Sequence, residues 1–372
     1  MEKSEVFELV KDFWEDEMIA TELYSFLSKK APKEKAKLFK AISAMEKNHA
    51  IVWNDVATRT FSVTFKAGIK LKIKTFFMKF LAIILPLTFM IYYLELDERK
   101  AVLNYSKILN VFKDDKELYD MVERVIKDEI EHEADLTDLI LGETSYLSKT
   151  KDAIYGMTDS LVEILALVIG LAGVVYNPLL IGLAGLISSV GGTFSMTSGA
   201  YLSTKSQNDI YEGKIKEVDV KEEIDPQSLK NDLKHALVEK GIEYDVSEKL
   251  VEIIGDDKRV LSNLVKSLSI EEVITNPKEA AVTTGTYYIL GALPAIIPFF
   301  LALAFPITSV TAAIIAVASA AIVSFVSGIF TAVLSGMNIK RKSFENVLII
   351  LGSAMATYFI GSMARLFLGI EI

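Results

Sequence analysis

Residues 280–339 read AAVTTGTYYILGALPAIIPFFLALAFPITSVTAAIIAVASAAIVSFVSGIFTAVLSGMNI and contain no aspartate, glutamate, lysine or arginine. An α-helix needs about 20 predominantly apolar residues to cross the hydrocarbon core of a bilayer. The run is therefore long enough for two membrane spans, with a turn near residues 305–309 (FPITS). These residues predict an integral membrane protein.

Two other stretches of the chain are almost as free of charge. Between residues 153 and 204 the only charged residues are Asp159 and Glu163, and the sequence Tyr176-Asn177-Pro178 divides this stretch into two more spans. Residues 346–364 are again uncharged and supply a fifth span. We therefore expect five transmembrane helices.

The composition is segregated along the chain. Of its 372 residues 51% are hydrophobic and 24% are charged, with a formal net charge of -9, and most of the charge lies in residues 1–150 and 205–278. The absence of cysteine excludes disulfides, zinc fingers and iron–sulfur clusters, so a metal site must use carboxylates, histidine or methionine. Net acidity argues against nucleic acid as a partner, and the acidic N-terminus is unlike a secretory signal peptide.

Basic residues at the span ends predict the orientation, because cytoplasmic loops are enriched in lysine and arginine. The loops near residues 177 and 308 are uncharged, whereas the opposite ends carry Lys149, Lys151, Lys205, Lys340, Arg341 and Lys342. We expect a multi-pass protein of the cell membrane, with the N-terminus inside and the C-terminus outside. The predicted divisions are a cytoplasmic helical domain (1–148), spans one and two (149–204), a cytoplasmic helical insert (205–278), and spans three to five (279–372).

The N-terminal 148 residues contain an internal repeat. Glu46-Lys47-Asn48-His49 and Glu129-Ile130-Glu131-His132 share the pattern Glu-x-x-His, and each is preceded by Glu-x-x-Ala-x-x-x-Tyr, once at 17–24 and once at 98–105. Residues three apart project from one face of a helix. Each Glu-x-x-His therefore presents a carboxylate and an imidazole to one point, as in di-iron four-helix bundles.

The repeat yields a set of candidate ligands for two iron ions. Glu46 and Glu129 would be bridging carboxylates and the histidines terminal ligands, while Glu95, one turn before Glu98, is a candidate extra ligand. The alternative is that Glu-x-x-His belongs to a solvated helix face, which would suit a single copy better than two. Tyr24 and Tyr105 are expected to pack behind the ligands rather than act as redox centres. The candidate ligands are Glu17, Glu46, His49, Glu98, Glu129 and His132.

On these motifs, residues 5–140 resemble the rubrerythrin-like branch of the ferritin-like superfamily. That resemblance implies oxidation of Fe(II), or reduction of peroxide, at a di-iron centre. The chain departs from rubrerythrins because it has no Cys-x-x-Cys module to supply electrons.

The segment 65–93 separates the two halves of the repeat and admits three interpretations. It combines Lys66, Lys70, Lys72, Lys74 and Lys79 with the apolar run FLAIILPLTFMIYYL. An interfacial helix with lysines toward anionic headgroups is one interpretation, and a buried helix that extends the bundle is another. A sixth span is the third, but it would put the two halves of the repeat on opposite sides of the membrane.

The first span carries the intramembrane acids, which are costly and usually functional. Asp159 and Glu163 are four residues apart and share a helix face, and Asp152 lies seven residues earlier. Met157 and Met196 could add thioether ligands, and Pro294 and Pro298 on span three free backbone carbonyls. The alternatives are a structural acid pair at the interface and ordinary packing of the methionines and prolines.

Residues 150–370 resemble the vacuolar iron transporter family. The matching segments are 152–173 (DAIYGMTDSLVEILALVIGLAG), 192–203 (GTFSMTSGAYLS), 287–300 (YYILGALPAIIPFF) and 356–361 (ATYFIG). The resemblance implies a homodimer that moves Fe(II), often also Mn(II), out of the cytosol, with metal-collecting glutamates in the insert.

The resemblance also shows departures in this chain. The counterparts of the insert glutamates are Glu212, Glu217, Glu222 and Glu223. Ser188 stands where the family has an acid on span two, and Ser160 where a glycine follows the first span's aspartate. Glu163 is a candidate to replace the lost carboxylate.

Together the two resemblances match membrane-bound ferritin proteins. The expected fold is all-α: a ferritin-like four-helix bundle, five transmembrane helices and a helical insert. The expected function is export of Fe(II), or Mn(II), with a di-iron domain that captures, oxidises or senses iron at the pore entrance. The alternative is a membrane-tethered ferroxidase or peroxidase whose helices mainly serve as an anchor.

Overall fold

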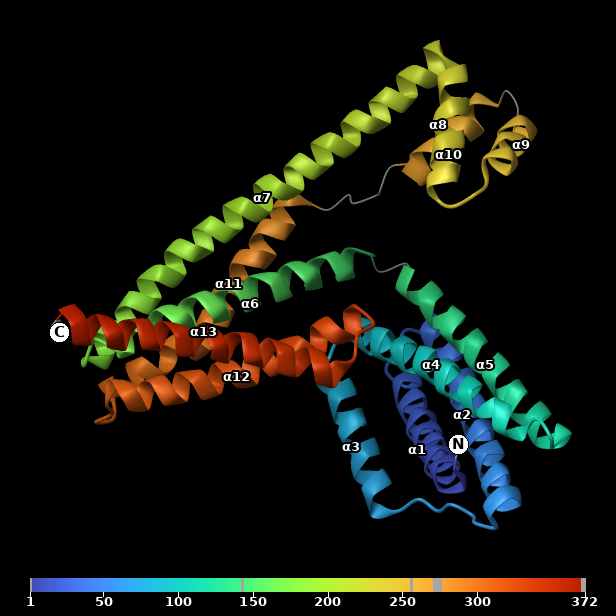
Figure 1. Ribbon diagram of the computed structural model, residues 1–372, viewed down its shortest axis with the longest axis horizontal. Helices are drawn as coiled ribbons and strands as arrows, with labels where there is room; N and C mark the ends of the chain where they lie inside the picture. Colours follow the sequence, from blue (N-terminus) through green and yellow to red (C-terminus); the bar gives the residue numbers. More distant parts are fainter. Residues whose placement is uncertain (1, 142–143, 255–256, 270–275, 369–372) are drawn as a thin grey trace. The chain divides into compact units, whose positions relative to one another are not determined.

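The computed structural model describes residues 2–141, 144–254, 257–269 and 276–368, and within these ranges the chain is helical with no β-strand. The all-α expectation is confirmed for this part of the chain. Figure 1 follows the helices along the sequence. They are α1 (Lys3–Ser28), α2 (Lys33–Phe61), α3 (Ile69–Ile84), α4 (Leu87–Leu109), η1 (Asn110–Phe112), α5 (Lys116–Leu141), α6 (Thr144–Ala172), α7 (Pro178–Ile224), α8 (Pro226–Glu239), α9 (Tyr244–Ile254), α10 (Lys258–Ser269), α11 (Pro277–Phe300), η2 (Leu301–Leu303), α12 (Ser309–Leu334) and α13 (Ile339–Leu368).

The chain divides into two compact units: residues 1–147 with 329–342, and residues 148–328 with 343–372. In the first unit, α1 packs against α2 and α4 against α5, while α2 also meets α5. These two helix pairs correspond to the two halves of the sequence repeat. Residues 329–342 belong to this unit, where the Phe330 ring lies 4.4 Å from that of Phe89, centroid to centroid.

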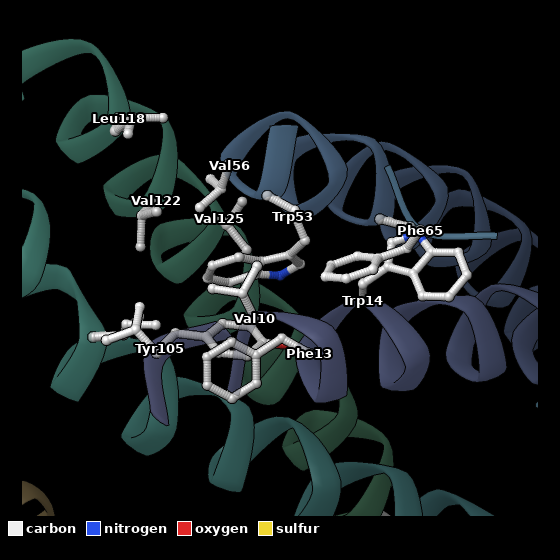
Figure 2. Close-up of a cluster of buried hydrophobic side chains, with 14 of the residues drawn as sticks. Val10, Phe13, Trp14, Trp53, Val56, Phe65, Tyr105, Leu118, Val122 and Val125 are labelled. Carbon is white, nitrogen blue, oxygen red and sulfur yellow. The ribbon is translucent and has the colours of Figure 1, made fainter. Parts of the chain in front are cut away.

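A cluster of buried aromatic and aliphatic side chains packs the helices of the first unit together (Figure 2). The Trp53 ring lies 5.0 Å from Phe13 and 4.8 Å from Tyr105, measured between ring centroids. Val10 and Val122 are fully buried around these rings. Three helices therefore converge on Trp53, because Phe13 comes from α1 and Tyr105 from α4.

The link from α2 to α3 is pinned to the bundle. Ser62, which follows α2, has φ 57° and ends the helix in the left-handed region. The Asn54 side chain then makes two hydrogen bonds to the backbone of Phe65. Its Oδ1 accepts from the Phe65 amide at 2.7 Å, and its Nδ2 donates to the Phe65 carbonyl at 3.3 Å. The chain is thereby directed into α3.

Helix α3 exposes a stripe of large apolar side chains. Ile69 is 79% exposed and Phe76 is 73% exposed, whereas Leu71 is buried. Lys74 and Lys79 pair with Glu15 and Glu22 of α1. This face does not fit the buried-helix interpretation, whereas residues 89–92 of the same segment, at the start of α4, are buried. The membrane-interface interpretation stays a prediction, and α3 is not among the five helices long and apolar enough to cross a membrane.

Within the residues that the structure describes, five helices are long and apolar enough to span a membrane, which agrees with the number expected from the sequence. They begin at Tyr146, Pro178, Pro277, Ser309 and Ile339. The turn expected near residues 305–309 lies between η2 and α12. The protein is therefore a multi-pass helical membrane protein.

Helix α7 differs from the expectation, because it runs without a break from Pro178 to Ile224 and crosses the predicted boundary at residue 205. It ends where Asp225 caps α8 and Pro226 cannot continue the α7 hydrogen-bond pattern. The far end of α7 packs with α8, α9 and α10 around Leu229, Leu233 and Leu261, which are fully buried. The helical insert is thus built on an extension of the second span.

The prolines of α11 have their freed backbone partly satisfied by a neighbour. Pro298 has no amide proton for the carbonyl four residues earlier, at Pro294. Ser319 of α12 donates its hydroxyl to that carbonyl at 2.8 Å. This carbonyl is therefore engaged in helix packing, which favours the packing interpretation of the prolines.

Candidate metal sites

The six candidate di-iron ligands lie together at the centre of the first unit. Each of its four long helices contributes, and every one of the six side chains is at most 6% exposed. Two overlapping sets have ligand atoms within 4.8 Å of one another. The first set is Glu17, Glu46, His49 and Glu129, and the second is Glu46, Glu98, Glu129 and His132.

Glu46 and Glu129 each face both imidazoles. The Nδ1 atom of His49 lies 3.4 Å from Glu46 Oε2 and 3.0 Å from Glu129 Oε1. The Nδ1 atom of His132 lies 3.0 Å from Glu46 Oε1 and 3.2 Å from Glu129 Oε2. Each carboxylate therefore turns one oxygen toward each histidine, which is the arrangement needed for a carboxylate to bridge two cations.

The two tyrosines cross over between the halves of the repeat. Tyr105 of α4 donates its hydroxyl to Glu17 Oε1 on α1 at 2.7 Å, and Tyr24 of α1 donates to Glu98 Oε1 on α4. Trp53 adds a second donor to Glu17 Oε1 at 3.2 Å. These hydrogen bonds fix the outer glutamates, and the role of the two tyrosines behind a metal site stays a prediction.

Several buried polar atoms of the cluster lack a hydrogen bond of acceptable geometry. They are both carboxylate oxygens of Glu46, Glu129 Oε1, His49 Nδ1 and His132 Nε2. Buried polar atoms in native proteins are almost always satisfied, so the orphaned atoms of Glu46, Glu129 and His49, which lie close together, fit a bound cation. The donor set of carboxylates and imidazoles suits iron or manganese, and the residues present therefore fit a pair of such ions.

Burial and mutual charge govern the ionisation of this cluster. Burial raises the pKa of Glu17 well above its usual range, and the negative charges of Glu129 and Glu46 add to the rise. Glu98 has a raised pKa for the same reasons. Burial opposes charge on the imidazoles, but the nearby carboxylates of Glu129 and Glu46 stabilise the protonated ring and raise the pKa of His49 to about 10. Those partners raise the pKa of His132 to about 9.

Some residues near the cluster differ from the sequence prediction or were missed by it. Glu95 does not join either ligand set, since its carboxylate pairs with Arg99. Asp128, which sequence reasoning missed, has Oδ2 3.1 Å from His49 Nε2 and orients that ring. Its sequence signal is weak, because an aspartate directly before Glu129 is ordinary on a charged helix.

In the second unit, the candidate path residues of α6 are only partly buried. Asp152, Asp159 and Met157 are half-buried, and Glu163 is exposed. Met196 of α7 is also half-buried. Among the described residues these side chains do not form a group of three or more His or acidic ligands, so their role in a metal path stays a prediction.

Glu163 is tied to another span by Tyr288, which sequence reasoning did not single out. Tyr288 of α11 is fully buried, and its hydroxyl donates to Glu163 Oε2 at 2.6 Å. The ring end passes Gly192 of α7, where any β-carbon would collide with the tyrosine. Three spans thus meet at this hydrogen bond, and the glycine is required for their close approach.

The insert glutamates lie along the surface of α7 and are not gathered into a cluster. Glu212, Glu217 and Glu223 are exposed and Glu222 is half-buried. Glu217 pairs with Lys221 at 2.8 Å, which lowers the pKa of its carboxyl group. Within the described residues no ligand group of three includes them. Metal collection by the insert stays a prediction.

Comparison with known proteins identifies the family of the membrane part of the chain. The sequence profile of the VIT family matches residues 150–362, which is more than half of the chain. The chain belongs to the VIT family. The matched residues include most of all five candidate spans and the insert between the second and third spans.

Of three relatives of this VIT-family chain, the first two have names that state iron as a cargo. Vacuolar iron transporter 1 of Arabidopsis thaliana is 25% identical over 202 residues, covering 54% of this chain and 79% of the relative. The vacuolar iron transporter of Centaurea cyanus is 26% identical over 186 residues, covering 49% and 75%. Protein CCC1 of Saccharomyces cerevisiae is 31% identical over 157 residues, covering 40% and 48%.

Proposed function

We propose that the protein transports divalent iron across a membrane, with Mn(II) as a second cargo. The observation that carries the proposal is the VIT-family match over residues 150–362, together with relatives named as iron transporters. The first matched helix carries two carboxylates, Asp159 and Glu163, within residues 153–172, which are otherwise uncharged. An acid in a span is costly unless it serves a function, and a divalent cation is a cargo that it can serve.

In this proposal α6 supplies the cation-binding groups of the path. Asp159 and Glu163 share a face, so a cation can pass from one carboxylate to the next. Tyr288 holds Glu163 through its hydroxyl at 2.6 Å and fixes the direction of that carboxylate. Met157 and Met196 would add softer ligands that suit a ferrous ion better than magnesium or calcium.

We also propose that the N-terminal unit is a ferritin-like domain that holds a pair of iron ions. Glu17 and His49 would hold one ion and Glu98 and His132 the other, while Glu46 and Glu129 bridge. Such a pair supplies redox chemistry between Fe(II) and Fe(III). The tyrosine and tryptophan donors behind the cluster hold its outer carboxylates in place. The cluster's histidines give up the protons that the cations displace.

The proposed direction is export from the cytosol by a homodimer in the cell membrane. The lysines and arginines at the span ends support an N-terminus and an insert on the cytoplasmic side. On that topology the acidic domain and the insert glutamates would collect the cation on the side from which it leaves. The dimer rests on the family resemblance of the spans.

A second candidate function is a membrane-tethered ferroxidase or peroxidase whose spans serve as an anchor. The observation that favours it is the pre-arranged cluster of carboxylates and histidines in the first unit. An anchor, however, needs neither the carboxylates of α6 nor the hydrogen bond from Tyr288 to Glu163. Transport therefore accounts for more of the chain.

Iron content of cells separates the two functions. Cells that lack their own exporter and express the chain should retain less iron after an iron load than cells with an empty vector. The Asp159→Asn variant should behave like the empty vector, while Asp209→Asn, which removes the same charge from an exposed site on α7, should behave like the wild type. An Asp159→Asn variant that lowers cell iron as well as the wild type would refute the transport proposal.

A further inference from the structure

A cavity in the first unit leads to the carboxylate cluster. It has a volume of about 170 Å³ and is lined mainly by α1 and α4. At its inner end lie Glu17, Glu98, Glu46 and Glu129, all of them buried. Both oxygens of Glu46 lack a hydrogen bond, so the cavity ends on an unpartnered, fully buried carboxylate. A cation that entered the cavity would meet free ligand atoms.

Two aspartates line the outer part of the same cavity. Asp16 precedes Glu17 on α1, and Asp97 precedes Glu98 on α4, so the repeated motif is Asp-Glu-x-x-Ala-x-x-x-Tyr. Both aspartates line the cavity and both remain exposed to solvent. Adjacent residues on a helix point about 100° apart, from its 3.6 residues per turn. Each helix thus turns a glutamate inward and an aspartate toward the opening.

The two aspartates share the lining of one cavity, and no ion pair of either is recorded within the described ranges. Lys100 of α4 also lines the cavity, but no lysine or arginine in the described ranges is recorded within 4.0 Å of either aspartate carboxylate, and Lys74 pairs with Glu15. An ordinary surface acid would have solvent on all sides rather than a second acid across a cavity.

We propose that Asp16 and Asp97 form an access site for divalent cations, where a hydrated ion is held between α1 and α4 before it moves inward to the glutamates. The inference rests on the proposed metal pair and adds a route to it. A hydrated cation holds its water tightly, and successive carboxylate oxygens along a short path let it exchange water in steps. An acidic cleft raises the local concentration of cations, and this increases their association rate by about 10- to 1,000-fold.

The test measures the rate of metal binding separately from its affinity. The full-length protein in detergent is stripped of metal and mixed rapidly with Co²⁺, a paramagnetic ion that quenches tryptophan fluorescence. Trp53 reports on the cluster, because its indole donates to Glu17, and the chain has only one other tryptophan, Trp14. The Asp16→Asn/Asp97→Asn double variant should bind Co²⁺ at least about tenfold more slowly, with an unchanged equilibrium dissociation constant.

Two controls keep the outcome specific. Asp12→Asn removes one charge from α1 a turn before Asp16, outside the cavity lining, and should bind at nearly the wild-type rate. Asp97→Glu keeps a carboxylate and should also stay near that rate. A double variant that binds as fast as the wild type, or an Asp12→Asn variant that is equally slow, would overturn the access site and leave the metal pair standing. A wild-type protein without saturable quenching would instead overturn the metal pair itself, and the access site with it.

Discussion

Replacing Tyr105 with phenylalanine removes one hydroxyl from behind the carboxylate cluster. That hydroxyl donates to Glu17 Oε1 at 2.7 Å, and both side chains are 3% exposed. The hydrogen bond favours the ionised form of Glu17, which is the form that binds a cation, whereas burial and the neighbouring acids favour the protonated form. We therefore expect Tyr105→Phe to weaken cation binding on the Glu17 side of the cluster.

The structure gives the size of the effect and an asymmetry. A hydrogen bond to a charged group contributes about 1.5–3 kcal/mol, and about 1.4 kcal/mol is a tenfold change in affinity. Trp53 still donates to the same oxygen of Glu17 at 3.2 Å, so the loss for Tyr105→Phe should lie near tenfold. Tyr24 is the hydroxyl donor to Glu98, with no indole beside it, so Tyr24→Phe should cost nearer a hundredfold.

Anaerobic titration of the metal-free protein with Fe(II) or Co²⁺ checks both numbers by calorimetry or tryptophan fluorescence. In each variant one of two equivalents should weaken and the other should keep its wild-type affinity. Tyr119→Phe, which removes a hydroxyl from α5 outside the cluster, is the matched control and should leave both equivalents unchanged. Equal weakening of both equivalents by Tyr105→Phe, or a smaller effect of Tyr24→Phe than of Tyr105→Phe, would refute the reasoning.

Three further outcomes follow from the described contacts. Both histidines of the cluster have raised pKa values, about 10 and about 9, so they hold protons at neutral pH. Cations must displace those protons, so calorimetry in buffers of different ionisation heat should show proton release and affinity that falls as the pH is lowered, and pH-independent binding would contradict this. Ser319→Ala leaves the Pro294 carbonyl unpaired inside the helix packing and should lower the thermal stability in detergent by about 1–3 kcal/mol, with Ser319→Thr as the rescue. Tyr288→Phe frees Glu163 from its hydrogen bond and should slow Fe(II) flux while expression and folding persist; wild-type flux would show that this hydrogen bond has no part in transport.

The five spans could be predicted because apolar length and missing charge are properties of the sequence alone. The run at 280–339 has no charged residue, and the structure places α11 and α12 in it. The length of α7 could not be predicted in the same way, since charged residues after 204 mark the end of the membrane rather than the end of the helix. The helix stops only where Pro226 interrupts the backbone pattern.

The sequence allowed us to predict that the six cluster residues lie close together, because the same helical spacing of ligand residues occurs twice. Their role as metal ligands stays a prediction, but the structure brings all six to one point. The partners of the cluster depend on contacts between helices and were missed for that reason. Trp53 and Asp128 reach the ligands across helix interfaces, and Tyr288 reaches Glu163 from a different span. Asp16 and Asp97 did carry a signal, because the repeat includes an aspartate before each glutamate.

Iron flux in proteoliposomes tests the transport proposal most directly. Purified full-length protein is reconstituted into vesicles that contain an Fe(II)-sensitive fluorophore, and Fe(II) is added outside under anaerobic conditions. We expect Fe(II) to cross in vesicles with the wild-type protein, and Asp159→Ala to reduce the flux to that of empty vesicles, with Asp209→Asn close to the wild type. Equal flux through Asp159→Ala and the wild type, or no flux above empty vesicles in either, would contradict the account.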